Sequence, residues 1–151
     1  MKKFFLLIVI AIATCKRESA DLNKFLQEPK NGAKVIVSKC MEETKFKITR
    51  IKVTPEEVIK GDNIAMKVQG QALEEVTMKD LKVIAHYNGA EIFSEVKDQG
   101  GKVVPVGGKF TFEYTQSVPT FTPVGSWDIN LYLRNDKDED VSCILAHFDI
   151  E

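Results

Sequence analysis

The chain has 151 residues, of which 44% are hydrophobic and 28% are charged, and its formal net charge is −1 at pH 7. This balance argues against a nucleic-acid partner, because a phosphate-binding surface needs a marked basic excess or a dense basic cluster. The length suits one domain that buries a proper hydrophobic core.

The first fifteen residues are interpreted as a secretory signal peptide. Lys2 and Lys3 precede an unbroken apolar run at residues 4–13. A membrane-spanning helix needs about 20 apolar residues, so this run is too short to span and is typical of a signal peptide. Cleavage fits after Ala13 or after Cys15, since each has a small residue two positions before it.

Removal of residues 1–15 would change the charge and leave two cysteines. The net charge would fall from −1 to −3, because Lys2 and Lys3 are lost. In an oxidising compartment the default expectation is that Cys40 and Cys143 form a disulfide. Such a bridge closes a loop of about a hundred residues and would stabilise the fold by about 4–5 kcal/mol on the chain-entropy model.

Residues 16–33 are mostly polar and contain Pro29 and Gly32, so we interpret them as an N-terminal arm or propeptide. We assign the folded domain to residues 34–151. One connection within it, residues 118–124 (VPTFTPV), is more apolar than an exposed loop normally is.

Apolar residues in the domain repeat with a period of two, which predicts β-strands. The alternating residues of the expected strands are Phe46 and Ile48, then Ile51 and Val53 after a slip in phase; Ile64, Met66 and Val68; Leu81, Val83, Ala85 and Tyr87; Ile92 and Phe93; Phe110, Phe112 and Tyr114; Trp127, Ile129, Leu131 and Leu133; and Ile144, Ala146, Phe148 and Ile150. The slip after Ile48 predicts a β-bulge. About seven or eight strands, with no amphipathic helix longer than two turns, are typical of a β-sandwich or barrel.

Glycine-containing turns separate several of these strands. Asn88-Gly89 predicts a two-residue hairpin, and residues 135–140 predict a longer polar turn between the last two strands. Gly100-Gly101 and Gly107-Gly108 are also interpreted as turns. Neither pair fits a phosphate-binding loop, because no strand-to-helix context or Lys-Ser/Thr follows.

The sequence contains no constellation that suggests catalysis or metal binding. His86 and His147 stand alone on predicted strands, where we expect each to be exposed or satisfied by a hydrogen bond. The acidic residues at 135–140 lack the oxygen spacing and central Gly of a calcium loop. We therefore expect no enzyme activity, no metal and no cofactor.

Motifs at both ends of the domain carry a family resemblance. Cys40 lies shortly before the strand FKITRIKVTP, which is followed by a Gly61-Asp62 turn and the strand IAMKVQG. Later, Pro123, Gly125 and Trp127 open a strand, LRNDKDEDVSC makes an acidic turn, and CILAHFDI closes the domain. In order and spacing these motifs resemble the ML lipid-recognition domain family. This family includes the soluble Niemann-Pick type C cholesterol-binding protein and the phosphatidylglycerol/phosphatidylinositol transfer proteins.

The resemblance implies an all-β fold, an immunoglobulin-like β-sandwich of two antiparallel sheets that enclose an apolar lipid cavity. It implies a disulfide between Cys40 and Cys143; relatives often carry further disulfides, for which this chain has no cysteines. It also offers a reason for the many inward-facing aromatic residues, which would line the cavity. The residues expected to bind lipid are Phe46, Ile64, Met66, Val68, Val83, Phe93, Phe110, Phe112, Tyr114, Phe121, Pro123, Trp127, Ile129, Leu131 and Phe148.

The function implied is that of a secreted, endosomal or lysosomal protein that carries a sterol or a phospholipid between membranes. Phe93 and Phe121 are expected at the cavity mouth, and Phe121, between two prolines, suits a portal or membrane contact. The implied partners are the lipid, membranes contacted transiently, and a membrane lipid transporter or receptor. The alternative is an immunoglobulin-like interaction module or lipid-presenting co-receptor, although Trp127 and the cysteines lack the true immunoglobulin spacing.

A basic stretch has two explanations. Lys45, Lys47, Arg50 and Lys52 decorate one predicted strand. A solvated sheet face or edge that discourages aggregation explains them adequately. The functional alternative is a weak attraction to anionic lipid headgroups, of about 1 kcal/mol per charge.

Overall fold

The computed structural model describes residues 32–151, in which ten β-strands and no helix occur. The strands are β1 (Ala33–Lys34), β2 (Ile36–Lys39), β3 (Phe46–Thr54), β4 (Glu57–Val58), β5 (Asn63–Ala72), β6 (Val76–Tyr87), β7 (Ala90–Val104), β8 (Lys109–Ser117), β9 (Gly125–Asn135) and β10 (Asp140–Ile150). The predicted signal peptide and nearly all of the predicted arm lie outside the described residues. Within residues 32–151, no helix has the length and apolarity that crossing a membrane requires.

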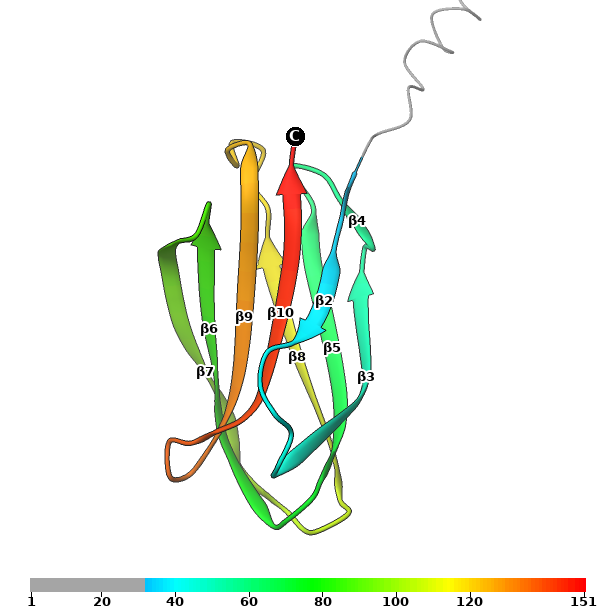
Figure 1. Cartoon of the computed structure of the whole chain (residues 1–151), viewed down its shortest axis with the longest axis vertical. Coiled ribbons are helices and arrows are strands. Elements are labelled where there is room, and N and C mark those ends of the chain that lie inside the picture. Colours follow the sequence, from blue (N-terminus) through cyan, green and yellow to red (C-terminus); the bar gives the residue numbers. More distant parts are fainter. Residues whose placement is uncertain (1–31) are drawn as a thin grey trace, which may run out of the picture. The chain divides into compact units, whose positions relative to one another are not determined.

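The strands form two packed layers (Figure 1). One sheet has five strands in the order β2-β10-β9-β6-β7, and the other has three in the order β3-β5-β8. The short strands β1 and β4 pair separately, and every pairing is antiparallel. The predicted all-β sandwich of antiparallel sheets is therefore confirmed.

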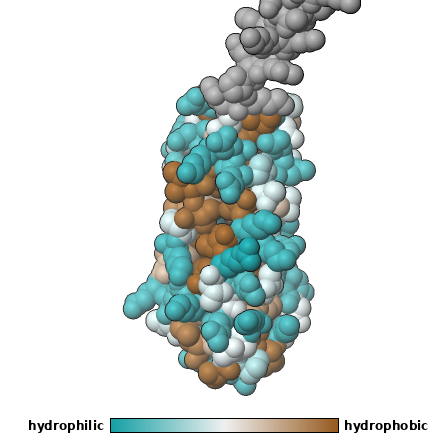
Figure 2. Space-filling model, turned by 90° about the vertical axis from the view of Figure 1, so that its right-hand side faces the viewer, coloured by the Kyte–Doolittle hydropathy of each residue, from teal (hydrophilic) through white to brown (hydrophobic). Residues whose placement is uncertain are grey.

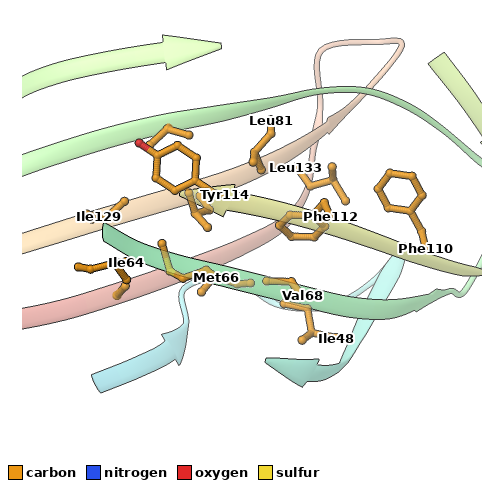
Figure 3. Packing of buried hydrophobic residues seen from close by; sticks show 14 of the residues in the cluster. Ile48, Ile64, Met66, Val68, Leu81, Phe110, Phe112, Tyr114, Ile129 and Leu133 are labelled. Atoms are coloured by element: carbon orange, nitrogen blue, oxygen red, sulfur yellow. The ribbon is translucent and has the colours of Figure 1, made fainter. Parts of the chain in front are cut away.

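The core lies between the sheets and is built from alternate residues of facing strands. Met66 and Val68 of β5 lie across from Leu133 of β9 (Figure 3), and all three are essentially inaccessible to solvent. Because successive strand residues point to opposite faces, the period of two seen in the sequence places these side chains inward. Gly70 leaves room for Phe46, since a Cβ at Gly70 would lie only 2.3 Å from the Phe46 ring.

Two local predictions are confirmed by the strand register. The pairing of β3 with β5 shifts between Ile48 and Arg50, as a bulge requires. Asn88 and Gly89 join β6 to β7 with positive φ angles of 47° and 85°, as a type I′ hairpin turn requires.

The prediction that Gly100-Gly101 forms a turn is wrong, because both residues lie within β7. They have positive φ angles, and Gly100 N donates a hydrogen bond to Asp98 Oδ1 at 2.7 Å. The register with β6 shifts here, between Met78 and Asp80, so the glycine pair belongs to a bulge inside a continuing strand. Gly107-Gly108, as predicted, lies in the turn between β7 and β8.

A disulfide joins Cys40 to Cys143, with 5.0 Å between the two Cα atoms. Cys40 directly follows β2, which pairs with β10 so that Lys39 lies opposite Ile144. Cys40 N also donates a hydrogen bond to Cys143 O at 3.0 Å. The bridge therefore fastens the segment after the edge strand β2 to β10, the strand beside it in the five-stranded sheet.

Candidate functional site

An apolar cavity of about 230 Å³ opens between the two sheets, at the end where β8 leads into β9. It is lined by Ala85, Ile92, Phe93, Gln116, Ser117, Val118, Pro119, Phe121, Thr122, Pro123, Trp127, Ile129 and Phe148. Only three of these side chains are polar and none is charged. Such a lining suits an apolar ligand.

The wall of the cavity on the five-stranded sheet depends on one small residue. Ala85 of β6 lies between Phe93 of β7 and Ile129 of β9 in the pairing of the strands. A larger side chain at Ala85 would extend into the space between the sheets. The methyl group instead leaves the space that the cavity occupies.

A bulge in β7 brings two consecutive apolar side chains to the cavity. The register of β6 with β7 shifts between Ala85 and His86, which leaves Ile92 without a partner in the ladder. Ile92 and Phe93 consequently both line the cavity, although neighbouring strand residues normally point to opposite faces. Their side chains are 54% and 44% exposed, which places them at the mouth.

The loop at residues 118–124 is anchored where it leaves β8. Val118 is buried and its backbone exchanges hydrogen bonds with the turn before β5, to Asp62 O at 2.8 Å and from Gly61 N at 2.6 Å. Within the loop, both N and Oγ1 of Thr122 donate to Pro119 O, at 3.0 and 2.6 Å. These bonds close a tight turn whose central residues include Phe121.

The same loop is anchored where it enters β9. Trp127 Nε1 donates to Pro123 O at 3.2 Å, and the Tyr87 hydroxyl donates to Val124 O at 2.6 Å. The Tyr87 and Trp127 rings pack with their centroids 4.9 Å apart. Phe121, which is 85% exposed, is thus presented to solvent from a loop held at both ends.

Comparison with known proteins identifies the family. A family model described as E1_DerP2_DerF2, ML domain, matches residues 34–150. The chain belongs to the ML domain family. Because ML domains recognise lipids, this membership supports a lipid-binding protein.

Several solved structures are similar to this ML domain, and the first of these shares its fold. The Niemann-Pick type C2 protein from Japanese carpenter ant has a TM-score of 0.56 and 17% identity, over 77% of this chain and 99% of that chain. The Pseudomonas fluorescens alkylpurine DNA glycosylase AlkC, bound to DNA containing an abasic site analog, has a TM-score of 0.50 and 15% identity. The match covers 71% of this chain and 30% of that chain. Chicken MD-1 complexed with lipid IVa has a TM-score of 0.44 and 12% identity, and the match covers 76% of this chain and 97% of that chain. The comparison with curated proteins gave no match.

The residues predicted to bind lipid fall into two groups in this ML domain. Those that line the cavity are Phe93, Phe121, Pro123, Trp127, Ile129 and Phe148. Those that lie in the closed core, at most 7% exposed and away from the cavity lining, are Phe46, Ile64, Met66, Val68, Val83, Phe110, Phe112, Tyr114 and Leu131. Core packing therefore accounts for most of the inward-facing aromatic residues, and a lipid-binding role of either group stays a prediction.

Several lining residues were not among those predicted. They are Ala85, Ile92, Gln116, Ser117, Val118, Pro119 and Thr122. The apolar character of loop 118–124 is a usable signal for Val118, Pro119 and Thr122, and the adjacent pair Ile92-Phe93 is one for Ile92. Ala85 and Gln116 carry no such signal, because an ordinary strand also contains alanine and glutamine.

The other charged contacts of the ML domain lie away from the cavity lining. Lys45 binds Glu139 and Lys79 binds Asp138, so that two lysines hold the turn between β9 and β10. The hydrogen bonds from these ammonium groups lower the pKa of both carboxyl groups. Within residues 32–151, no group of three or more His, Cys, Asp or Glu side chains is placed to hold a metal ion.

His147 of β10 should make stability depend on pH. Its Nδ1 lies 2.6 Å from Asp128 Oδ1, and this hydrogen bond raises the pKa of the His147 imidazole. The stabilisation is complete below the unfolded pKa of about 6.5 and is lost as pH rises through the raised folded pKa. Replacing His147 with Asn should therefore lower the free energy of unfolding in urea more at about pH 5.5 than at about pH 9. An equal loss at both pH values would contradict this assignment.

The outer face of the three-stranded sheet is cationic. Its exposed charged residues are Lys47, Arg50, Lys52, Lys67, Lys109 and Glu113. Arg50, Lys52 and Lys67 surround a shallow hollow of about 320 Å³. Because β3 is an edge strand, the prediction of a charged edge is confirmed for all of its basic residues except Lys45, which precedes the strand.

The long side between β2 and β3 carries apolar side chains that reach the surface. These two edge strands belong to different sheets and are not paired. Figure 2 shows hydrophobic residues gathered along this side of the molecule. A groove of about 590 Å³ here is lined by residues that include Val35, Val37, Ile51 and Val53.

Proposed function

We propose that this ML domain carries a lipid between membranes, with an apolar part of the lipid held in the cavity at the β8–β9 end. The observation that carries the proposal is the uncharged, apolar lining of a cavity whose mouth is formed by the exposed residues Ile92, Phe93 and Phe121. Family membership supports the lipid class of ligand in general. Whether the lipid is a sterol or a phospholipid is decided by the experiment below.

The volume of the cavity limits how much of the lipid it holds. About 230 Å³ is below the range of about 300–1,000 Å³ typical of small-molecule pockets. One acyl chain or one end of a sterol fits this size better than two acyl chains. If about 200 Å² of apolar surface leaves water, the gain is about 5 kcal/mol before ordering costs, at 25 cal/mol per Å².

The mechanism proposed is partition, without a bond made or broken. A lipid leaves one membrane and enters the cavity through its mouth, so that contacts with the apolar lining replace contacts with the bilayer interior. It leaves through the same mouth at another membrane. The rim residue Phe121 makes the transient contact with the bilayer, because it is the most exposed large apolar side chain at the mouth. A membrane lipid transporter or receptor would be the protein that receives the lipid.

The proposed location is outside the cell or in an endosomal or lysosomal lumen. The signal peptide predicted at residues 1–15 supports entry into the secretory route. The disulfide between Cys40 and Cys143 suits an oxidising compartment.

The test is mass spectrometry of lipids that copurify with the natively expressed protein. We expect one lipid class to be enriched over its share of the host membranes, at about one molecule per protein. Fluorescent sterol and fluorescent phospholipid should then be tested separately at saturating concentration. Absence of copurifying lipid together with no binding of either probe would overturn the proposed function.

A further inference from the structure

Gln116 is a polar side chain in the wall of the apolar cavity, and only part of its hydrogen-bonding capacity is used. Its Oε1 accepts a hydrogen bond from the Tyr114 hydroxyl at 2.5 Å, and its Nε2 donates to Ser117 O at 2.9 Å. A carboxamide has two N–H donors and two acceptor lone pairs. One N–H and one lone pair of Gln116 are therefore left for a ligand.

The other two polar lining residues, Thr122 and Ser117, are less well placed to hydrogen-bond to a ligand. The Thr122 hydroxyl donates its proton to Pro119 O at 2.6 Å, inside the turn of loop 118–124. Ser117 is exposed, and the alternation of β8 places it on the opposite face from Tyr114 and Gln116. Gln116 is thus the lining side chain best placed to meet the polar end of a bound molecule.

The groups beside Gln116 disfavour an anion at this position. Tyr114 is only 2% exposed, and burial, aided by the Glu95 carboxylate, raises the pKa of its phenol so that the hydroxyl stays protonated. Lys97 lies 3.7 Å from Glu95 Oε1 and 4.8 Å from the Tyr114 ring centroid. Glu95 follows Phe93 on the same face of β7 and Lys97 comes after it, so along this strand the acid lies nearer the cavity than the lysine does.

We infer that the polar end of the ligand is an uncharged hydroxyl that hydrogen-bonds to the Gln116 carboxamide. This inference rests on the proposed function and names its ligand class: an apolar alcohol, whose body fills the cavity. A carboxylate or phosphate at Gln116 would lose water without gaining a cation, because no lining residue is charged. A hydroxyl can use both the free N–H and the free lone pair of Gln116.

The test uses three competitors with the same alkyl chain. The uncharged dye N-phenylnaphthylamine is bound to the purified protein and displaced by dodecanol, by dodecyl methyl ether or by dodecanoate. One neutral hydrogen bond corresponds to about 2- to 12-fold in affinity, so dodecanol should bind about 3- to 10-fold more tightly than the ether. Dodecanoate should bind more weakly than dodecanol.

Variants assign the preference to Gln116. In Gln116→Leu the ratio of alcohol to ether affinity should fall to about one, with both affinities measured by displacement of the dye from that variant. The double variant Tyr114→Phe with Gln116→Leu should give the same result without leaving the Tyr114 hydroxyl unpaired. Gln69→Leu, on the outer face of the same sheet, is the matched control and should keep the native ratio.

The possible failures are distinguishable. Equal binding of alcohol and ether by the native protein, a tighter binding of dodecanoate, or a native ratio in Gln116→Leu would overturn the hydroxyl inference and leave lipid carriage standing. If neither the dye nor any competitor binds, the proposed function fails and the inference fails with it.

Discussion

An aspartate in place of Phe121 should slow lipid transfer between vesicles about tenfold or more, and should change the free energy of unfolding by less than about 0.5 kcal/mol. Phe121 is 85% exposed, so the folded protein buries little of it. Burying a Phe side chain in a bilayer contributes about 1.5–3 kcal/mol, which corresponds to about 10- to 100-fold in the contact step. Transfer of a fluorescent lipid from donor to acceptor vesicles measures the first effect, and urea unfolding measures the second.

Two control variants separate the portal from general surface charge. Phe121→Leu keeps an apolar tip and should retain most of the transfer rate. Val106→Asp introduces the same charge at a residue that is 70% exposed in the turn before β8, whereas loop 118–124 follows β8. If Val106→Asp slows lipid transfer as much as Phe121→Asp does, Phe121 has no special role at the portal. A marked loss of stability in Phe121→Asp would instead make Phe121 a structural residue.

The predictions that succeeded came from features that short sequence segments determine. The period of two marks which residues of a strand face inward, and Asn88-Gly89 is a local turn signal that depends on few distant contacts. The slip after Ile48 likewise shows in the residues themselves, because a bulge reverses the phase of the alternation. These features specified the sandwich and one of its bulges before any pairing was known.

The predictions that failed or were missing depended on distant partners. Strands β1 and β4 have two residues each and β2 has four, too few to show an alternation. The sequence predicts a turn at Gly100-Gly101, because a glycine pair in a bulge and a glycine pair in a turn have the same sequence. Only the pairing with β6 distinguishes them.

The position of the cavity could not be predicted from alternation. Inward-facing residues are the same whether the sheets touch or separate, so the closed core at Phe112 and the open end at Phe148 have the same sequence pattern. What separates the two regions is the distance between the sheets and the small size of Ala85. The apolar loop at 118–124 and the adjacent pair Ile92-Phe93 are the sequence features that indicate which end is open.

Removal of the disulfide should lower the free energy of unfolding by about 4–5 kcal/mol, a large part of the 5–15 kcal/mol typical of a domain. The bridged cysteines are 103 positions apart, so the bond restricts a long loop in the unfolded chain. The double variant Cys40→Ala with Cys143→Ala is preferred, because Cys143 is buried and a lone thiol would add reactions of its own. Urea unfolding of the variant and of the native protein measures the difference.

The same variant should keep the affinity of the cavity for N-phenylnaphthylamine under conditions where it is folded. In β10, Ile144, Ala146 and Phe148 face the core, and the alternation puts Cys143 on the outer face of the sheet. Asn130 Nδ2 of β9 lies 3.8 Å from Cys40 Sγ, so Cys40 is on the same outer face of the sheet as Asn130. A loss of stability below about 1 kcal/mol would contradict the chain-entropy account. A loss of dye affinity in the folded variant would mean that the bridge also holds the sheets at the spacing that the cavity requires.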